Sequence, residues 1–145
     1  MKKLFLVSMM FVATMGACKP AEVPPPRDEV RGALYAIEWA FQQADKACAA
    51  IADDDIEKAN FTAAKDTAGA CSDALDAAKP DMAADFEDLA NWTPDSAKHV
   101  ECRAGSSVAA MVVLKKALLQ RGVELPEVND GELRAQWLLS KCSVK

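Results

Sequence analysis

The chain has 145 residues, of which 17 are basic and 22 acidic, and its formal net charge is −5. This length suits one small domain. The acidic balance argues against nucleic acid as a partner, and against binding of anionic headgroups by the protein surface, because like charges repel.

The first 17 residues have the layout of a secretory signal peptide. Lys2 and Lys3 form a positive head, and an apolar run from 4 to 13 follows, interrupted only by Ser8. This run is shorter than the roughly 20 apolar residues of a transmembrane helix. We therefore expect residues 1–17 to be removed during export.

The stretch Met15-Gly16-Ala17-Cys18 follows this run. It resembles the lipobox of bacterial lipoproteins, in which an apolar residue and two small residues precede a cysteine. Met15 replaces the leucine that usually opens the motif, and the resemblance covers Met1 to about Pro20. It implies that Cys18 receives a diacylglycerol and becomes the first residue of the mature chain. The alternative is a plain secreted protein with Cys18 free or paired, although Met15 is bulky for ordinary signal cleavage after Ala17.

The same resemblance implies a place in the cell envelope. In lipoproteins of enteric-type bacteria, an aspartate after the lipidated cysteine favours the inner membrane, and this chain has Lys19 there. The outer membrane is therefore the expected destination. Two or three acyl chains, such as palmitate, would anchor the protein firmly, since each buried methylene contributes about 0.8 kcal/mol. Loss of Lys2 and Lys3 would leave 15 basic and 22 acidic residues, a net charge of −7.

Residues 18–27 are expected to form a semi-rigid tether, and residues 28–145 a helical domain. The tether contains Pro20, Pro24, Pro25 and Pro26. Proline fixes φ and favours extended backbone.

The first expected helix carries one apolar stripe from 30 to 51. Its members are separated alternately by four and three residues, the spacing of a single helical face. They are Val30, Leu34, Ile37, Phe41, Ala44, Cys48 and Ile51. Asp53, Asp54 and Asp55 follow, and we interpret them as a helix–helix turn whose last member caps the next helix. The alternative is a cation site with Glu57, but calcium loops space their ligands at alternate positions and include a glycine.

The second expected helix runs from about 56 to 78, with an alanine-rich face that would allow close approach of a partner helix. Lys79-Pro80 should end it. The helical spacing of the next apolar residues favours a short separate helix or helical crossover over 81–91. These residues are Met82, Phe86 and Leu89.

The third expected helix begins with strong local signals and extends to about Arg121. Thr93 is a good N-cap, and Pro94 suits the first helical position. Gly122 suits the C-terminal stop. The helix is apolar on several faces, which predicts a central position. Its main stripe comprises Val100, Ala104, Ser107, Met111, Leu114 and Leu118.

A loop from 123 to 129 and a turn at Asn129-Asp130-Gly131 should precede the fourth helix, which would run from about 131 to 142. We find no alternating strand pattern. The sequence therefore predicts an all-α fold, an antiparallel bundle of about four helices.

Four cysteines remain besides Cys18, namely Cys48, Cys71, Cys102 and Cys142. An even number in an exported chain predicts two disulfides. A metal site is the alternative, but no pair has the spacing CxxC, and His99, the only histidine, is not at ligand spacing from a cysteine.

Helix geometry ranks the pairings. If the first hairpin turns at Asp54, Cys71 lies roughly 15 Å further from the turn than Cys48 does. Bridged Cα atoms must lie within about 7 Å, which disfavours Cys48–Cys71. Cys71 precedes the end of the second expected helix by about as many residues as Cys102 follows the start of the third, so these two lie at similar heights. We therefore predict Cys71–Cys102 and, by elimination, Cys48–Cys142, each contributing about 2–4 kcal/mol.

No catalytic constellation is evident, and we expect neither an enzyme nor a cofactor. His99 is expected on an exposed helix surface, and the serine at Ser106 lacks the GxSxG context of a nucleophile elbow. Asp85, Glu87 and Asp88 are clustered but are expected on a solvated face. No phosphate-binding glycine loop is present.

Three tryptophans stand out in a chain with few aromatic residues. Trp39 lies off its helical stripe, and Trp92 precedes a helix cap, so both are weak candidates for partner contacts; with Trp137 they could instead cover the core. The sequence predicts a lipid-anchored envelope protein whose acidic helical domain binds a protein partner, expected to be basic, as an accessory, inhibitor or immunity-type factor. The alternatives are a lipoprotein that binds a small ligand or metal, and a purely structural envelope protein.

Overall fold

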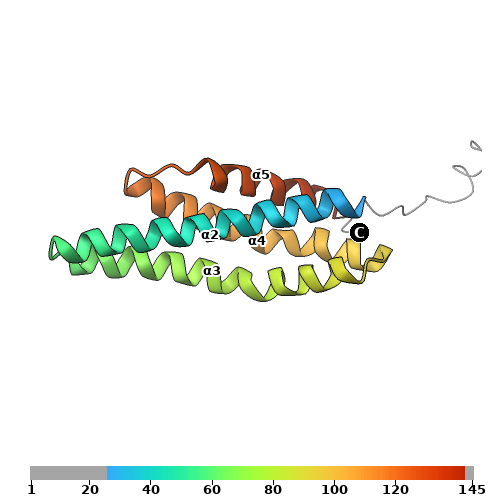
Figure 1. Ribbon diagram of the computed structural model, residues 1–145, viewed down its shortest axis with the longest axis horizontal. Coiled ribbons are helices and arrows are strands. Elements are labelled where there is room, and N and C mark those ends of the chain that lie inside the picture. Colours follow the sequence, from blue (N-terminus) through green and yellow to red (C-terminus); the bar gives the residue numbers. More distant parts are fainter. Residues whose placement is uncertain (1–25, 143–145) are drawn as a thin grey trace, which may run out of the picture.

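The computed structural model describes residues 26–142 (Figure 1). The predicted signal peptide, Cys18 and nearly all of the tether lie outside these residues. Four helices form the described chain: α2 (Arg27–Glu57), α3 (Phe61–Ala90), α4 (Pro94–Gln120) and α5 (Pro126–Ser140). The predicted all-α fold is confirmed, and residues 26–142 contain no strand.

The helices form an antiparallel bundle in which each packs against the next along the chain and α5 returns to α2. The four helices therefore form a four-sided bundle, and we refer to its two consecutive hairpins, α2–α3 and α4–α5, as its two layers. The first α2 residue and the last α5 residue lie at the same end of the bundle, and the α2–α3 turn at the other end extends past the α4–α5 turn (Figure 1). The α2–α3 hairpin is therefore the longer layer.

The core follows the predicted stripes closely. Six of the seven stripe residues of α2 are buried, and Ile51 is partly buried. All six stripe residues of α4 are buried. The central position predicted for α4 is wrong, because Val112, Val113 and Leu119 are 44–49% exposed on its outer side. The surplus apolar residues of this helix face solvent.

Pro80 does not end the second helix, and the short helix predicted over 81–91 is part of α3. Proline inside a helix removes one hydrogen bond and costs about 3 kcal/mol. Here Pro80 is exposed, and the buried face continues on both sides of it through Ala78, Met82 and Leu89. Burial of this longer face against the bundle offsets the local cost.

The three aspartates at 53–55 do not form the predicted turn, because α2 continues to Glu57. The turn lies at Lys58–Asn60. The amide of Asn60 donates to the carbonyl of Asp55 (2.7 Å), and the amide of Ala59 donates to that of Ile56 (3.0 Å). This is a Schellman C-cap, with Ala59 at a φ of 57° in the left-handed region.

The predicted start and stop of α4 are confirmed. The Thr93 hydroxyl accepts a hydrogen bond from the Ser96 amide at 3.0 Å, and Pro94 is the first helical residue. Gly122 has a φ of 75° and ends α4 with the same Schellman pattern as the α2–α3 turn.

The predicted start of the last helix is wrong by five residues. Pro126 is the first residue of α5, which includes Asn129 and Asp130 instead of following them. Gly131 is buried, and a Cβ atom there would lie 2.6 Å from the Cβ of Ala40 and 2.8 Å from the Cε of Met111. Gly131 therefore marks a close helix contact, not a turn.

The four cysteines form two disulfides, but the predicted pairing is wrong. Cys48 bonds to Cys71, with Cα atoms 6.5 Å apart, and Cys102 bonds to Cys142, with Cα atoms 4.9 Å apart. Each bond closes one hairpin and therefore lies within one layer.

The cause of the wrong pairing is the misplaced α2–α3 turn. Cys48 precedes Glu57 by nine residues, and Cys71 follows Phe61 by ten. The two cysteines are therefore level across the hairpin. A turn placed about five residues too early moves them apart by about ten residues, or roughly 15 Å.

Candidate functional surface

The structure does not bring the two candidate tryptophans together. Trp39 is 52% exposed on α2, 12 residues from the first residue of α2, or about 18 Å along the axis. Trp92 lies in the α3–α4 connection and packs partly buried against the core. That connection is beside the start of α2, because the Arg27 Nε donates to the Leu89 carbonyl at 2.8 Å. Of the two, only Trp39 is exposed.

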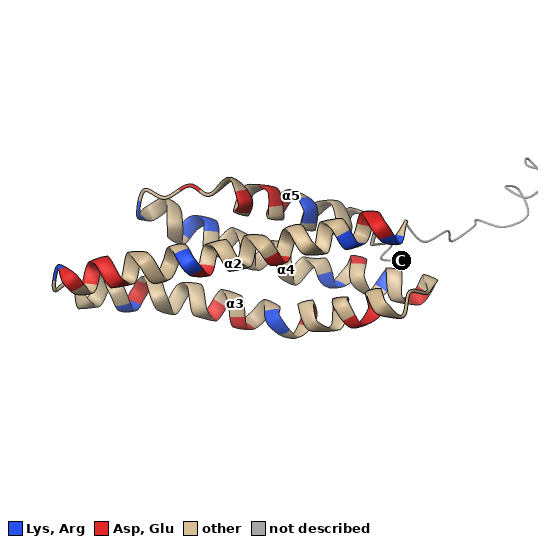
Figure 2. Cartoon of the chain, viewed as in Figure 1, with Lys and Arg blue, Asp and Glu red and all other residues tan. Residues whose placement is uncertain are grey.

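Charge is divided unequally between the two layers. The α2–α3 hairpin, residues 27–90, has 15 acidic and six basic residues, a net charge of −9. The α4–α5 hairpin, residues 94–142, has six acidic and seven basic residues, a net charge of +1. Figure 2 shows acidic residues along both helices of the first layer. The surplus negative charge of the described chain thus belongs to one side of the bundle.

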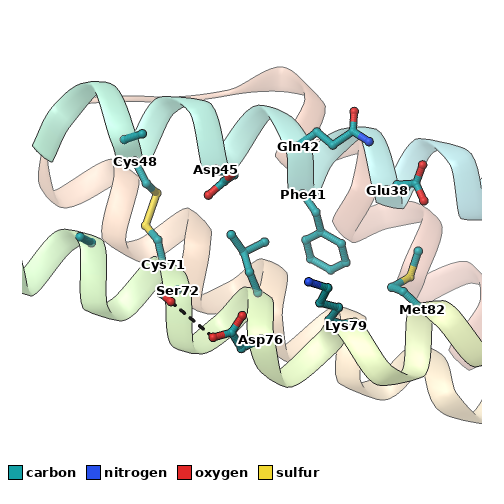
Figure 3. Close-up of a pocket in the computed structure, with 13 residues that line it drawn as sticks. Glu38, Phe41, Gln42, Asp45, Cys48, Cys71, Ser72, Asp76, Lys79 and Met82 are labelled. Carbon is teal, nitrogen blue, oxygen red and sulfur yellow. Dashed lines mark hydrogen bonds between the residues drawn. A yellow bond between two sulfur atoms is a disulfide. The ribbon is translucent and has the colours of Figure 1, made fainter. Parts of the chain in front are cut away.

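A groove of about 550 Å³ lies between α2 and α3 in this acidic layer (Figure 3). Its volume is in the range of pockets that bind ligands. Side chains from both helices line it. They are Glu38, Phe41, Gln42, Asp45, Cys48 and Ala49 of α2, and Ala68, Cys71, Ser72, Leu75, Asp76, Lys79 and Met82 of α3.

Apolar atoms form the floor of the groove. Phe41 and Met82 are 9% and 7% exposed, and the Cys48–Cys71 disulfide is almost fully buried. Leu75 packs partly buried against this core. The groove persists because residues beside the disulfide, such as Ala49 and Ala68, are too small to fill the space between the helices.

Charged side chains form the rims of the groove. Glu38 and Asp45 lie on the α2 side, and Asp76 and Lys79 lie on the α3 side (Figure 3). The Ser72 hydroxyl donates to the Asp76 carboxylate at 3.4 Å. Three carboxylates and one ammonium group give the rims a net negative charge above an apolar floor.

A buried ion pair joins the layers near the α2–α3 turn. Asp55 is 3% exposed and pairs with Arg121, which is the C-cap of α4 and also donates to the Thr67 hydroxyl at 2.8 Å. The hydrogen bond from Arg121 lowers the pKa of Asp55. Asp54 pairs separately with Lys58 at 2.9 Å. The aspartates at 53–55 therefore do not converge on a common point.

A second buried ion pair joins α3 and α4. Asp85 is 1% exposed, so its expected place on a solvated face is wrong. The Arg103 Nε donates to Asp85 at 2.9 Å, and the same guanidinium pairs with Asp88. Burial raises the pKa of Asp85 to about 7, although Arg103 acts in the opposite direction. The sequence contained a signal for this burial, because Asp85 lies three residues from Met82 and four from Leu89, on their stripe.

His99 lies at the edge of this cluster. Its Nδ1 is 3.9 Å from the Asp88 carboxylate, and its side chain is 64% exposed, as expected for a surface histidine. Within residues 26–142, no group of three or more potential metal-binding side chains converges. Within the same residues, no helix is long and apolar enough to cross a membrane.

Comparison of the chain with models of protein families, with curated proteins and with solved structures finds no match.

Proposed function

We propose that this protein is a non-enzymatic envelope lipoprotein that binds a basic protein partner through its α2–α3 layer. A diacylglycerol on Cys18 would anchor it in a membrane. The outer membrane is the expected one, because Lys19, and not an aspartate, follows Cys18. The observation that supports the binding role is the charge difference between the layers, −9 against +1. Binding of this kind is the work of an accessory, inhibitor or immunity-type factor.

The charge difference favours a partner over a structural role for the acidic side. Clustered like charge destabilises a compact protein through self-repulsion, and it accelerates association with a partner of opposite charge. Anionic headgroups would repel the same layer, so attachment to the membrane would depend on the acyl chains.

The lengths of the tether and of α2 set the reach of the acidic layer. The eight steps from Cys18 to Pro26 span at most about 29 Å. The 31 residues of α2 extend about 46 Å beyond that point. Tethering confines both molecules to the envelope, which raises the local concentration and lets moderate affinity suffice.

Capture from envelope extracts tests the binding role. The full-length protein, extracted in mild detergent, is immobilised at low salt, and bound proteins are eluted with rising salt. We expect basic proteins that elute at moderate salt because exposed charges are screened. Asp45→Asn with Asp76→Asn should reduce capture, since both residues are exposed in the acidic layer. The matched control is Glu124→Gln with Asp130→Asn on the other layer.

Two results would contradict this proposal. Recovery of no protein at low salt would remove the binding role. Equal loss of capture in both double variants would show that the layers do not differ. The anchor is tested separately by the intact mass of membrane-extracted protein, where loss of residues 1–17 and added acyl mass on Cys18 are expected.

A further inference from the structure

We propose that the groove between α2 and α3 is the docking site, and that its occupant is a cationic amphipathic helix of the partner protein. This inference rests on the proposed function and specifies which part of the acidic layer binds the partner. The partner helix would lie along the groove, insert apolar side chains between α2 and α3, and place lysine or arginine side chains against the rims.

The floor of the groove suits apolar side chains. Phe41, Leu75 and Met82 offer ring, branched and thioether surfaces within one continuous lining. The flexible methionine side chain adapts its shape to different contacts. A groove of this kind between two parallel or antiparallel helices is a common receptor for the apolar face of a third helix. The volume of about 550 Å³ suits several side chains of such a helix, with its backbone outside the groove.

The rims specify the charge of the occupant. Glu38 and Asp45 are seven residues apart, two helical turns or about 10.5 Å on α2. A partner helix running alongside α2 repeats its own faces at this interval, so cations at positions i and i+7 would meet both carboxylates. Asp76 on the opposite rim would receive a cation from the other side of the same helix. Lys79 balances one of the three carboxylates, and an acidic or neutral occupant would leave the other two without compensating charge.

The groove is also held open before any partner arrives. The Cys48–Cys71 disulfide crosses its floor and fixes the spacing of α2 and α3 at that level. A receptor with fixed walls loses little conformational freedom on binding. We therefore expect binding without rearrangement of the bundle.

A designed peptide provides the probe, because the partner is not identified. The peptide has about 18 residues, with leucine on one helical face and lysine elsewhere, and carries a fluorophore for anisotropy measurements with the intact protein. A peptide with glutamate in place of lysine is the charge control. We expect the lysine peptide to bind with a Kd below about 100 μM at low salt and the glutamate peptide not to bind.

Two pairs of variants locate the peptide on the protein. Asp45→Asn with Asp76→Asn removes two carboxylates from the rims, and Asp66→Asn with Asp73→Asn removes two from α3 outside the groove. Both pairs change the net charge equally. We expect at least a tenfold increase in Kd for the rim pair and less than a threefold increase for the other pair.

Filling the groove tests its shape independently of charge. Ala68→Trp places a large ring in the groove, and Ala77→Trp places the same ring on an exposed α3 position that does not line it. We expect at least a tenfold increase in Kd for Ala68→Trp and no more than a twofold change for Ala77→Trp. Ala49→Trp repeats the test from the α2 wall if Ala68→Trp lowers the thermal stability.

Three outcomes would overturn this site. They are absence of lysine-peptide binding at about 1 mM protein, equal effects of the two asparagine pairs, and equal effects of the two tryptophan variants on α3. Each leaves the proposed function standing if envelope proteins are still captured through the acidic layer. Failure of capture by the wild-type protein, in contrast, removes the function itself.

Discussion

Gly131 provides a sharp test of the packing between the layers. An alanine there would place its Cβ 2.6 Å from the Cβ of Ala40 on α2 and 2.8 Å from the Cε of Met111 on α4. The Met111 side chain can rotate away, but the Ala40 Cβ is fixed to the α2 backbone. Helix α5 must therefore move outward to accept the extra methyl group.

The expected magnitude combines two opposing effects. Overpacking of a core contact costs about 1–3 kcal/mol, and replacing a helical glycine by alanine gains about 1 kcal/mol in helix propensity. Because the clash is with a fixed atom, we expect Gly131→Ala to lower the free energy of unfolding by about 1–2 kcal/mol. Gly32→Ala is the matched control, since Gly32 is exposed in α2 and a Cβ added there would have no neighbouring atom within 4 Å. It should raise the free energy by up to about 1 kcal/mol.

Urea denaturation followed by circular dichroism measures both changes. A second substitution, Ala40→Gly, removes the atom that clashes, so it should be less harmful in the Gly131→Ala protein than in the wild type. The coupling in this double-mutant cycle should reach about 1 kcal/mol. If Gly131→Ala stabilised the protein as much as Gly32→Ala, α5 would not lie as close to α2 as described.

Three further outcomes are expected. Ala59→Gly should raise the free energy of unfolding by about 0.5–1 kcal/mol in urea titrations, because glycine accepts the left-handed conformation at the α2–α3 turn without strain; a loss would contradict this. Cys48→Ser with Cys71→Ser should cost about 3 kcal/mol, and peptide mapping without reduction should recover these two cysteines joined. Asp85, with its pKa raised by burial to about 7, binds a proton in the folded protein that the unfolded chain has released above about pH 4. Stability should therefore fall as pH rises from about 4 to 7, with up to about 1.4 kcal/mol per pH unit from Asp85, and burial raises the pKa of Glu101 in the same direction. Asp85→Asn should make this slope shallower in urea titrations; an unchanged slope would refute it.

The helices themselves were predictable because the spacing of apolar residues identifies their buried faces. The stripe of α4 from Val100 to Leu118 is buried throughout. Thr93 and Gly122 delimit this helix as their backbone preferences require. At these positions, local preference and burial in the bundle agree.

The errors arose where local preference and burial disagree. Pro80, Asp55 and Gly131 all favour turns when read locally, yet each lies inside a helix. Burial of the α3 face on both sides of Pro80 offsets the local cost of this proline. Asp55 is paired with an arginine from α4, and Gly131 is required by close helix packing. Their roles depend on residues far away in the sequence, which no local pattern contains.

The groove was not predicted, because it depends on the register of two helices. Glu38 and Asp45 each adjoin a stripe residue of the first expected helix, and Asp76 adjoins Leu75, which packs against the core. Their meeting across one groove follows only from the turn at Lys58–Asn60. The misplaced turn that produced the wrong disulfides would also have misaligned these three carboxylates.

The disulfides respect the division into two layers that the charges also show. Each disulfide closes one hairpin, whereas the described ion pairs of the buried aspartates, Asp55–Arg121 and Asp85–Arg103, run from the acidic layer to α4. Three aspartates of the charged layer, Asp55, Asp85 and Asp88, thus pair with arginines of the other layer. The groove is lined only by residues of one disulfide-closed hairpin, and Met82 at its floor is the lining residue with a described hydrogen bond to α4, from the Ser107 hydroxyl at 3.7 Å. Substitution of Arg121, whose partner Asp55 does not line the groove, should therefore lower the stability of the bundle more than it lowers peptide affinity.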